Sequence, residues 1–344
     1  MRNNGFNMLK FGLHRLPPSE NRRVRQGFRD VSCRLLKASP DHSPQTSADF
    51  EFVVRNLRLS SGIYRRTYPG RFADLDGAVN ATLLEVFGTD ASRNSPIEVH
   101  DWAASDCSVS AEWASSLWNL FPAARLVASD ILFHLIEVSK SQGNEGFIVE
   151  PDGAAIQYIR PPFVLSLQAP IPWYYPVNSW IASKAKRRLD EIRSVLQRCQ
   201  WPGDEHAVLQ LPPWTVQQIS LIHPRARLMR TTDSRFEIRQ HSVFAALPAP
   251  TNIIRTMNIF NRGYFNESQL LQGMRAVFDS LSDGGIWIVG RTTEETRPSI
   301  NRASIFQKKG QSFFLRSRFN GGAEIEDLIL SNLGSASRMV PDYE

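Results

Sequence analysis

Short apolar runs alternate with segments of helical periodicity along most of the chain. Apolar residues recur at helical spacing over residues 72–87, and Gly88 follows as a stop signal. Residues 97–102 have the length and composition of a buried strand, and a helix at 111–120 and a second strand at 125–129 follow. This order predicts βαβ construction and a mainly parallel sheet.

The same alternation returns in the last third of the chain. The predicted elements are strands at 235–243, 252–257 and 286–290, a helix at 269–281, and a terminal hairpin of 303–307 with 313–319. A Gly-Gly turn at Gly284 and Gly285 separates the helix from the strand after it. The expected fold class is α/β, with a Rossmann-like, mostly parallel sheet and a C-terminal antiparallel hairpin.

A long interruption at residues 134–220 separates the two halves of this pattern. It contains an apparent hairpin around Pro151-Asp152-Gly153 and a charged helix at 179–199. Insertions beside the carboxyl ends of parallel strands often cover a ligand crevice. We therefore predict an inserted hairpin-helix lid or substrate subdomain at 134–220, between domain halves at 50–133 and 221–335. An insertion that simply packs elsewhere is the alternative.

The N-terminal residues 1–49 differ in character from the rest. The first 50 residues hold nine Lys/Arg against four Asp/Glu, which leaves a net charge of only +1 for the other 294 residues. We expect a disordered, basic extension, ending in a Ser/Pro/Asp-rich linker, with an organelle transit peptide as the alternative. The nearly neutral body gives no support for a nucleic-acid partner.

Cysteine content and hydropathy narrow the cellular setting. Three scattered cysteines argue against a disulfide framework and against a structural zinc site. No run approaches the roughly 20 apolar residues that a membrane-spanning helix needs. We expect a cytoplasmic protein without a transmembrane segment.

A loop of small residues follows the first predicted strand. Asp101 ends the strand, and Ala103, Ser105 and Cys107 occupy alternate positions after it. Small residues let a backbone lie close to a ligand, and alanine or serine can serve there if φ stays negative. The spacing resembles the D-x-G-x-G-x-G loop of class I S-adenosylmethionine-dependent methyltransferases, with every glycine replaced. The resemblance implies that these four residues contact the cofactor S-adenosyl-L-methionine.

Positions after the second and third predicted strands extend the resemblance. Asp130 stands where the family has an acidic residue that holds both ribose hydroxyls, a role that suits a carboxylate. A helix N-cap is the alternative role for Asp130, because Ile131 and the next two residues are apolar. The resemblance also implies cofactor contacts for Ile131 and for Ser242, where the family often has a polar residue near the adenine amine.

The loop after the fourth predicted strand supplies the candidate catalytic residues. Residues 253–265 resemble the matching segment of chemotaxis-receptor-type methyltransferases, which implies acceptor contacts for Asn258, Arg262 and Tyr264. That loop contains no carboxylate that could act as a general base. His241 and His223 are the nearest candidate bases in sequence order, although a lone histidine is more often structural.

The absence of an evident base leads to a hypothesis about the acceptor. A carboxylate acceptor is already nucleophilic, and the planar guanidinium of Arg262 or Arg255 suits its orientation. Arg255 alternates within a predicted strand, so pairing inside the fold is its alternative role.

The resemblance covers roughly residues 95–320 and rests on the order and spacing of elements. It implies methyl transfer from S-adenosyl-L-methionine to a small-molecule or protein acceptor. A methyltransferase-like fold that has lost catalysis and serves as a binding or regulatory module is the main alternative, because the loop lacks glycine. A different nucleotide-binding α/β enzyme is the third hypothesis, but the sequence lacks G-x-G-x-x-G and phosphate-loop patterns.

Overall fold

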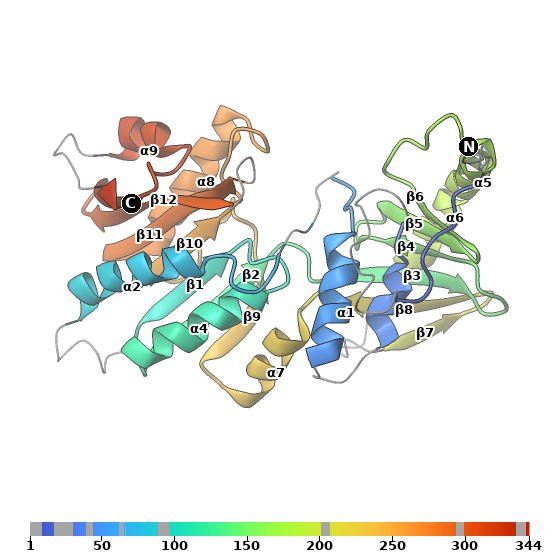
Figure 1. Ribbon diagram of the computed structural model, residues 1–344, viewed down its shortest axis with the longest axis horizontal. Coiled ribbons are helices and arrows are strands. Elements are labelled where there is room, and N and C mark those ends of the chain that lie inside the picture. The colour runs from blue at the N-terminus through green and yellow to red at the C-terminus, as the bar shows by residue number, and fades with distance from the viewer. Residues whose placement is uncertain are drawn as a thin grey trace, which may run out of the picture. The chain divides into compact units, whose positions relative to one another are not determined.

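A computed structural model describes residues 9–16, 30–38, 44–61, 65, 67–88, 96–200, 207–293, 299–334 and 342–343. The chain divides into two compact units (Figure 1). The α/β unit comprises residues 68–131 and 225–344, and the antiparallel unit comprises residues 1–67 and 132–224. Among the described residues, none of the helices is both long and apolar enough to span a membrane.

An eight-stranded sheet forms the centre of the α/β unit. Its order is β9 (Phe236–Gln240), β2 (Arg125–Asp130), β1 (Glu98–Trp102), β10 (Thr251–Met257), β11 (Leu281–Thr293), β12 (Ile300–Lys309), β13 (Ser312–Phe319) and β14 (Asp342–Tyr343). The first five strands are parallel, whereas β12 is antiparallel to both of its neighbours. The α/β, mostly parallel prediction with a C-terminal antiparallel hairpin is confirmed.

Helices cover both faces of this sheet. Strand residues alternate between the faces, so Asp101 and Arg255 point to one side and Trp102 and Ile254 to the other. The side of Asp101 carries α2 (Ala73–Phe87) and α4 (Ser108–Leu120), which contact each other. The side of Trp102 carries α8 (Glu267–Ser280) and α9 (Glu326–Leu333). The helix α7 (Pro224–Thr232) precedes β9.

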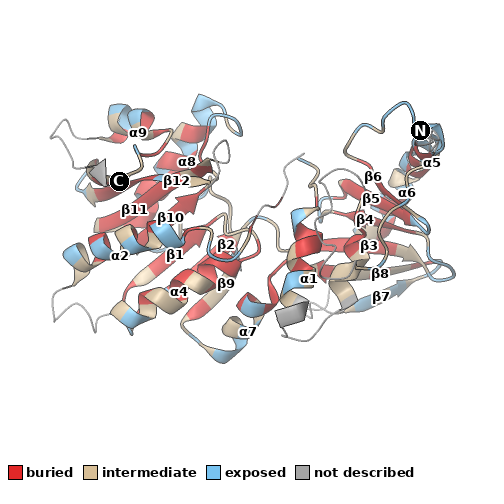
Figure 2. Cartoon of the chain, in the orientation of Figure 1, coloured by how far each residue is buried: buried red, intermediate tan, exposed pale blue. Residues whose placement is uncertain are grey.

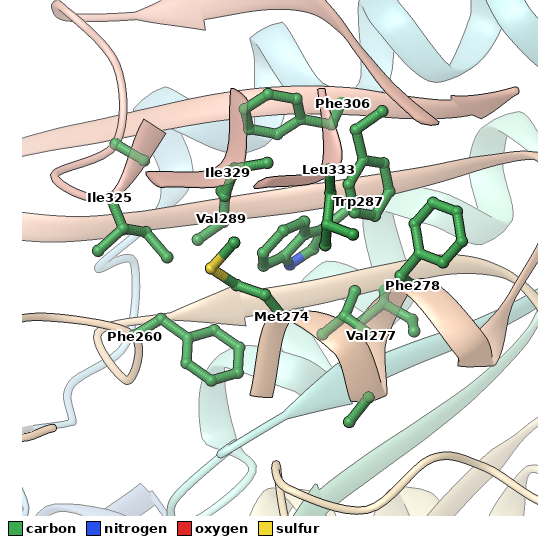
Figure 3. Packing of buried hydrophobic residues seen from close by; sticks show 14 of the residues in the cluster. Phe260, Met274, Val277, Phe278, Trp287, Val289, Phe306, Ile325, Ile329 and Leu333 are labelled. Atoms are coloured by element: carbon green, nitrogen blue, oxygen red, sulfur yellow. The ribbon is translucent and has the colours of Figure 1, made fainter. Parts of the chain in front are cut away.

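The core on the α8 and α9 side is rich in aromatic rings. Trp287 of β11 lies close to Phe260 and Phe306, with ring centroids 6.1 and 6.0 Å away (Figure 3). The ring of Phe313 is 5.3 Å from that of Trp287. Its indole N–H donates to the Thr256 hydroxyl at 2.9 Å, so the buried donor is satisfied. Figure 2 shows that the central strands are largely buried, as a sheet covered on both faces requires.

The antiparallel unit is built on a six-stranded sheet. Its order is β6 (Phe163–Ser166), β5 (Ala155–Arg160), β4 (Gly146–Val149), β3 (His134–Lys140), β8 (Trp214–Ser220) and β7 (Val208–Leu211). The predicted hairpin around Gly153 is present, because β4 and β5 pair antiparallel. The helices α5 (Pro176–Lys186) and α6 (Leu189–Gln197) pack on one face, where the sequence pattern predicts a single helix at 179–199.

Part of the N-terminal extension packs on the other face of this sheet. The 3-10 helix η2 (Cys33–Ala38) and the helix α1 (Pro44–Arg55) are formed, so the expectation of disorder over residues 1–49 differs from the structure there. Gln157 of β5 attaches this segment to the sheet, because its side chain accepts a hydrogen bond from the Cys33 amide and donates one to the Val31 carbonyl. Residues 1–8, 17–29 and 39–43 lie outside the described residues.

Candidate functional site at the carboxyl edge of the parallel sheet

The loop between β1 and α4 has an unusual backbone conformation. Ala103, Ser105 and Cys107 have φ values of 57°, 56° and 62°, so all three occupy the left-handed region. The condition under which alanine or serine could replace glycine there, a negative φ, is therefore not met. A left-handed conformation costs a residue with a Cβ about 1–2 kcal/mol, whereas glycine adopts it readily. The loop thus keeps a glycine-type backbone without its glycines.

Hydrogen bonds from neighbouring elements hold the strained loop. The Ala104 amide donates to the Ser129 carbonyl at 2.8 Å, and the Ser105 amide donates to Oδ2 of Asp130 at 2.8 Å. At the start of α4, the Ser108 amide and hydroxyl both donate to Oδ1 of the buried Asp106, at 2.9 and 2.7 Å. The end of β2 and the first turn of α4 therefore fix the loop together.

Asp130 ends β2 beside this loop. No helix begins after it in the described chain, because β3 follows from His134, so the N-cap alternative is wrong. One carboxylate oxygen orients the Ser105 amide, which places the carboxyl group at the carboxyl edge of the sheet. The next residue, Ile131, has a side chain that is 65% exposed, and its carbonyl accepts from the Gln240 side chain.

Asp101 lies beneath the loop in a buried cluster of charges. Its carboxylate accepts from Arg255 on β10 at 2.6 and 3.0 Å and from the Ser110 hydroxyl at 2.6 Å. Arg255 also pairs with Asp76 of α2 at 3.1 Å and lies over the Trp113 ring at 4.0 Å. The Asp101 carboxylate is committed to this cluster.

The guanidinium of Arg255 is fully buried by the same cluster, with none of its side chain exposed. The hypothesis that Arg255 orients an acceptor is therefore wrong, and its alternative role, pairing inside the fold, is the one observed. Burial raises the pKa of Asp76 to about 6 against the opposing charge of Arg255, with the nearby carboxylate of Asp101 adding to the rise.

The end of β9 contributes His241 and Ser242 to the same edge. The His241 amide donates to the Asp130 carbonyl at 3.0 Å, which continues the pairing of β9 with β2. Its ring lies 4.6 Å from that of Trp102, the residue that directly precedes the 103–107 loop. The Ser242 hydroxyl accepts from the Phe244 amide at 3.3 Å.

His100 is a buried histidine that sequence reasoning did not single out. It shares a strand face with Trp102, and its Nδ1 has no hydrogen-bond partner among the described residues. Burial, together with the charges of Arg239 and His241, lowers the pKa of His100 to about 4. In the sequence, only the alternation of His100 with Trp102 along the strand indicates that the His100 side chain lies on the same sheet face as Trp102. His223, in contrast, is a buried residue of the antiparallel unit, 3.6 Å from Glu51.

Most of the polar side chains of the loop after β10 form hydrogen bonds and ion pairs with other residues of the α/β unit. Asn258 has a φ of 61°, and its side chain accepts from the Thr292 amide and donates to the Thr292 hydroxyl. Arg262 is exposed and pairs with Asp327 of α9 at 2.8 Å. Tyr264 is 48% exposed, and the Arg262 side chain is 55% exposed.

Comparison with known proteins gave matches only among solved structures. No family profile and no curated protein sequence matches the chain. One similar structure is an O-methyltransferase of neocarzinostatin biosynthesis, in complex with S-adenosyl-L-homocysteine and 1,4-dihydroxy-2-naphthoic acid, with 10% identity and a TM-score of 0.24. The match covers 65% of this chain and 41% of that one.

Two further similar structures show the same level of likeness. An amino pentose methyltransferase from Micromonospora echinaspora, bound to S-adenosylmethionine, has 8% identity and a TM-score of 0.28 over 71% of this chain and 67% of that one. An O-methyltransferase family protein from Burkholderia thailandensis has 8% identity and a TM-score of 0.30 over 74% and 44%. Such values do not assign a function.

The topology of the α/β unit is informative by itself. Numbered along the chain within this unit, its first five strands stand in the order 3-2-1-4-5, with the 103–107 loop directly after the central first strand. Ligands of such sheets bind outside the carboxyl ends of the strands, where the strand order reverses. The α/β unit therefore has a Rossmann-like sheet order, with an antiparallel hairpin after the fifth strand.

Proposed function

We propose that the α/β unit binds S-adenosyl-L-methionine at the 103–107 loop and transfers its methyl group to a small-molecule or protein acceptor. The single observation that carries the proposal is the left-handed backbone at Ala103, Ser105 and Cys107. Three strained residues in one short loop concentrate a cost that folded proteins tolerate mainly at functional sites. This loop also lies at the switch point of the sheet order, where such folds bind ligands.

The residues beside the loop fit the proposed cofactor in part. The Cys107 side chain is fully buried, so its Cβ turns into the fold and does not fill the space outside the sheet edge. Asp130 stands at the end of the second strand and suits a ligand with paired hydroxyls. When bound, the cofactor supplies an electrophilic methyl group, and the task of this chain is to position the acceptor in line with it.

The acceptor side of the proposal rests on Arg262 and Tyr264. Both are exposed on the loop after β10, at the same sheet edge as the 103–107 loop, because β1 and β10 are parallel neighbours. A carboxylate acceptor would displace the Asp327 carboxylate from its ion pair with the Arg262 guanidinium. Such an acceptor needs no general base, which agrees with the low pKa values and burial of His100 and His241.

A binding or regulatory module without catalysis is the second candidate function. The amides of Ala104, Ser105 and Cys107 all donate to acceptors within the protein. Asp101 is neutralised by Arg255, and Asn258 is held by Thr292. These contacts favour a fixed loop that binds a ligand without assisting a reaction.

Calorimetric titration with S-adenosyl-L-methionine and S-adenosyl-L-homocysteine tests the proposed binding. We expect both to bind the full chain, and Asp130→Ala to weaken the affinity by at least about tenfold, since hydrogen bonds to a charged group contribute roughly 1.5–3 kcal/mol. Asp279→Ala, on the exposed face of α8, is the matched control and should bind as the wild type does. No binding at millimolar ligand would contradict the proposal.

A separate measurement distinguishes the two candidate functions. The full chain is incubated with methyl-labelled cofactor and a panel of small carboxylic acids, and labelled methyl ester is measured. Label transfer supports the methyltransferase. Tight cofactor binding without transfer to any acceptor in a wider screen of small molecules and proteins supports the binding module.

A further inference from the structure

A pocket of about 650 Å³ lies entirely within the antiparallel unit. Its walls come from the β3–β4 turn, the end of β5, the helix α5 and the residue before α6. Neither the parallel sheet nor its loops contribute to it. The pocket is therefore a candidate ligand site that is separate from the proposed cofactor site and does not depend on it.

Basic side chains outnumber acidic ones in the lining of this pocket. Lys140, Arg160, Lys184 and Arg188 contribute four positive charges, and Glu145 contributes the one carboxylate. Like charges gathered in a partly enclosed space repel one another, and an anion bound among them relieves that repulsion. The charge balance therefore selects for an anionic ligand.

Three of these charged groups form an ion-paired cluster in the pocket lining. Glu145 pairs with Lys140 at 3.0 Å and with Arg188 at 2.5 Å, and it accepts from the Tyr158 hydroxyl at 2.8 Å. Arg188 also lies over the ring of Trp214 at 5.2 Å. Burial and the neighbouring Glu145 together raise the pKa of Tyr158 to about 12, so the hydroxyl stays protonated.

The other two basic groups have no carboxylate partner among the described residues. The Lys184 ammonium lies 3.9 Å from the centre of the Trp180 ring, which holds it in place without neutralising it. Arg160 ends β5 and is exposed beside Tyr158. Two uncompensated cations in one pocket match a doubly charged anion better than a singly charged one.

Apolar groups complete the lining and set the size of the ligand. Ile181 and Ala185 of α5, with Pro161 after β5, give the pocket an apolar wall. A volume of about 650 Å³ exceeds what a phosphate ion alone would fill and is within the range of small-molecule sites. The ligand therefore has an apolar body as well as its charge.

We propose that this pocket binds a small phosphate monoester, with the phosphate held by Arg160 and Lys184 and an apolar ring against Ile181 and Ala185. Arginine offers a fork of donors and lysine a compact charge, and both contacts are charge-assisted hydrogen bonds. Because the pocket and the 103–107 loop belong to different units, occupancy of the pocket is expected with or without S-adenosyl-L-methionine present.

Calorimetric titration of the full chain with phenyl phosphate tests this proposal. Phenol and inorganic phosphate serve as probes that carry only the ring or only the charge. We expect phenyl phosphate to bind, inorganic phosphate to bind more weakly, and phenol to give no measurable binding. Binding should also weaken as salt is added, because the contacts are ionic and partly exposed.

Surface variants show whether the pocket is responsible. Arg160→Gln and Lys184→Gln should each raise the Kd for phenyl phosphate by about tenfold, the effect of losing one charge-assisted hydrogen bond. Lys186→Gln, on the same helix but outside the pocket, should leave the Kd unchanged. All three positions are exposed, so folding is retained.

Three results would overturn the proposal. They are no binding of phenyl phosphate at millimolar concentration, equal affinity in all three variants and the wild type, or equal affinity for inorganic phosphate and phenyl phosphate. The proposed methyltransferase activity is unaffected by any of them, because cofactor titrations report on the other unit.

Discussion

Arg255 and Asp101 face each other across the parallel strands β10 and β1 and form a doubly hydrogen-bonded ion pair inside the α/β unit. The pair lies directly beneath the 103–107 loop, because Asp101 is followed by one strand residue and then by the loop. In this position the first acidic residue of the loop motif is held by a cation from the neighbouring strand. The contact ties the conformation of the loop to the register of the two central strands.

Removing one member of this pair should be costly. Arg255→Met leaves Asp101 and Asp76 buried without their cation, and we expect the free energy of unfolding of the α/β unit to fall by about 3–5 kcal/mol. Arg125→Met on β2, which breaks an exposed pair with Glu237, should cost less than about 1 kcal/mol. Urea unfolding of both variants makes the comparison, and equal losses would contradict the buried cluster.

Glycine should relieve strain at a position where the backbone is left-handed. Ala103→Gly removes a Cβ at a φ of 57°, so we expect a gain in stability of about 0.5–1 kcal/mol despite the greater freedom of glycine in the unfolded chain. Ala104→Gly, the neighbouring position without a positive φ, should be destabilising by a similar amount. Thermal unfolding distinguishes the two, and loss of stability in both variants would argue against strain.

His100 should remain uncharged well below neutral pH. Its pKa is about 4 in the folded chain against an ordinary value of 6.5, chiefly because it is buried. Between these pH values the unfolded chain takes up a proton that the folded chain refuses, so stability falls as the pH drops from 6.5 towards 4. An NMR titration of the His100 ring measures this pKa directly, and a midpoint near 6.5 would contradict the buried environment.

Variants of Arg262 and Asp327 show whether the Arg262 guanidinium only pairs with Asp327 or also binds the acceptor. The pair is exposed, so neither Arg262→Ala nor Asp327→Ala should change the thermal midpoint. If Arg262 orients an acidic acceptor, Arg262→Ala should raise the KM for that acceptor about tenfold, whereas Asp327→Ala should leave it equal or lower, since a competing carboxylate is removed. Equal KM values in both variants would remove Arg262 from the acceptor site.

The alternation of strands and helices in the α/β unit could be predicted because each element has a clear period. Helix 269–281 corresponds closely to α8, and strand 286–290 to the inner part of β11. Gly284 and Gly285, predicted as a turn before the strand, lie inside β11, where Gly284 has a φ of 79°. The architecture of residues 134–220 could not be predicted in full. The hairpin was visible from its turn residues, but the pairing of β3 with β8 joins segments some 80 residues apart, and local pattern carries no information about such a contact.

The candidate site was predictable in position but not in detail. Strand ends and small residues locate the 103–107 loop and Asp130, because parallel strands finish at one edge of the sheet. The left-handed backbone and the partner of Asp101 depend on tertiary contacts with Ser129, Asp130 and Arg255, which no local pattern encodes.

Hydrogen exchange measured with and without S-adenosyl-L-homocysteine tests the proposed cofactor site most directly. The account predicts that the ligand slows exchange at residues 103–108, at 129–131 and at 241–243, the three segments that meet at the carboxyl edge of the parallel sheet. Strands β4 and β5 of the antiparallel unit serve as the internal reference and should be unchanged. Unchanged exchange in all three segments at saturating ligand, or protection confined to other regions, would contradict it.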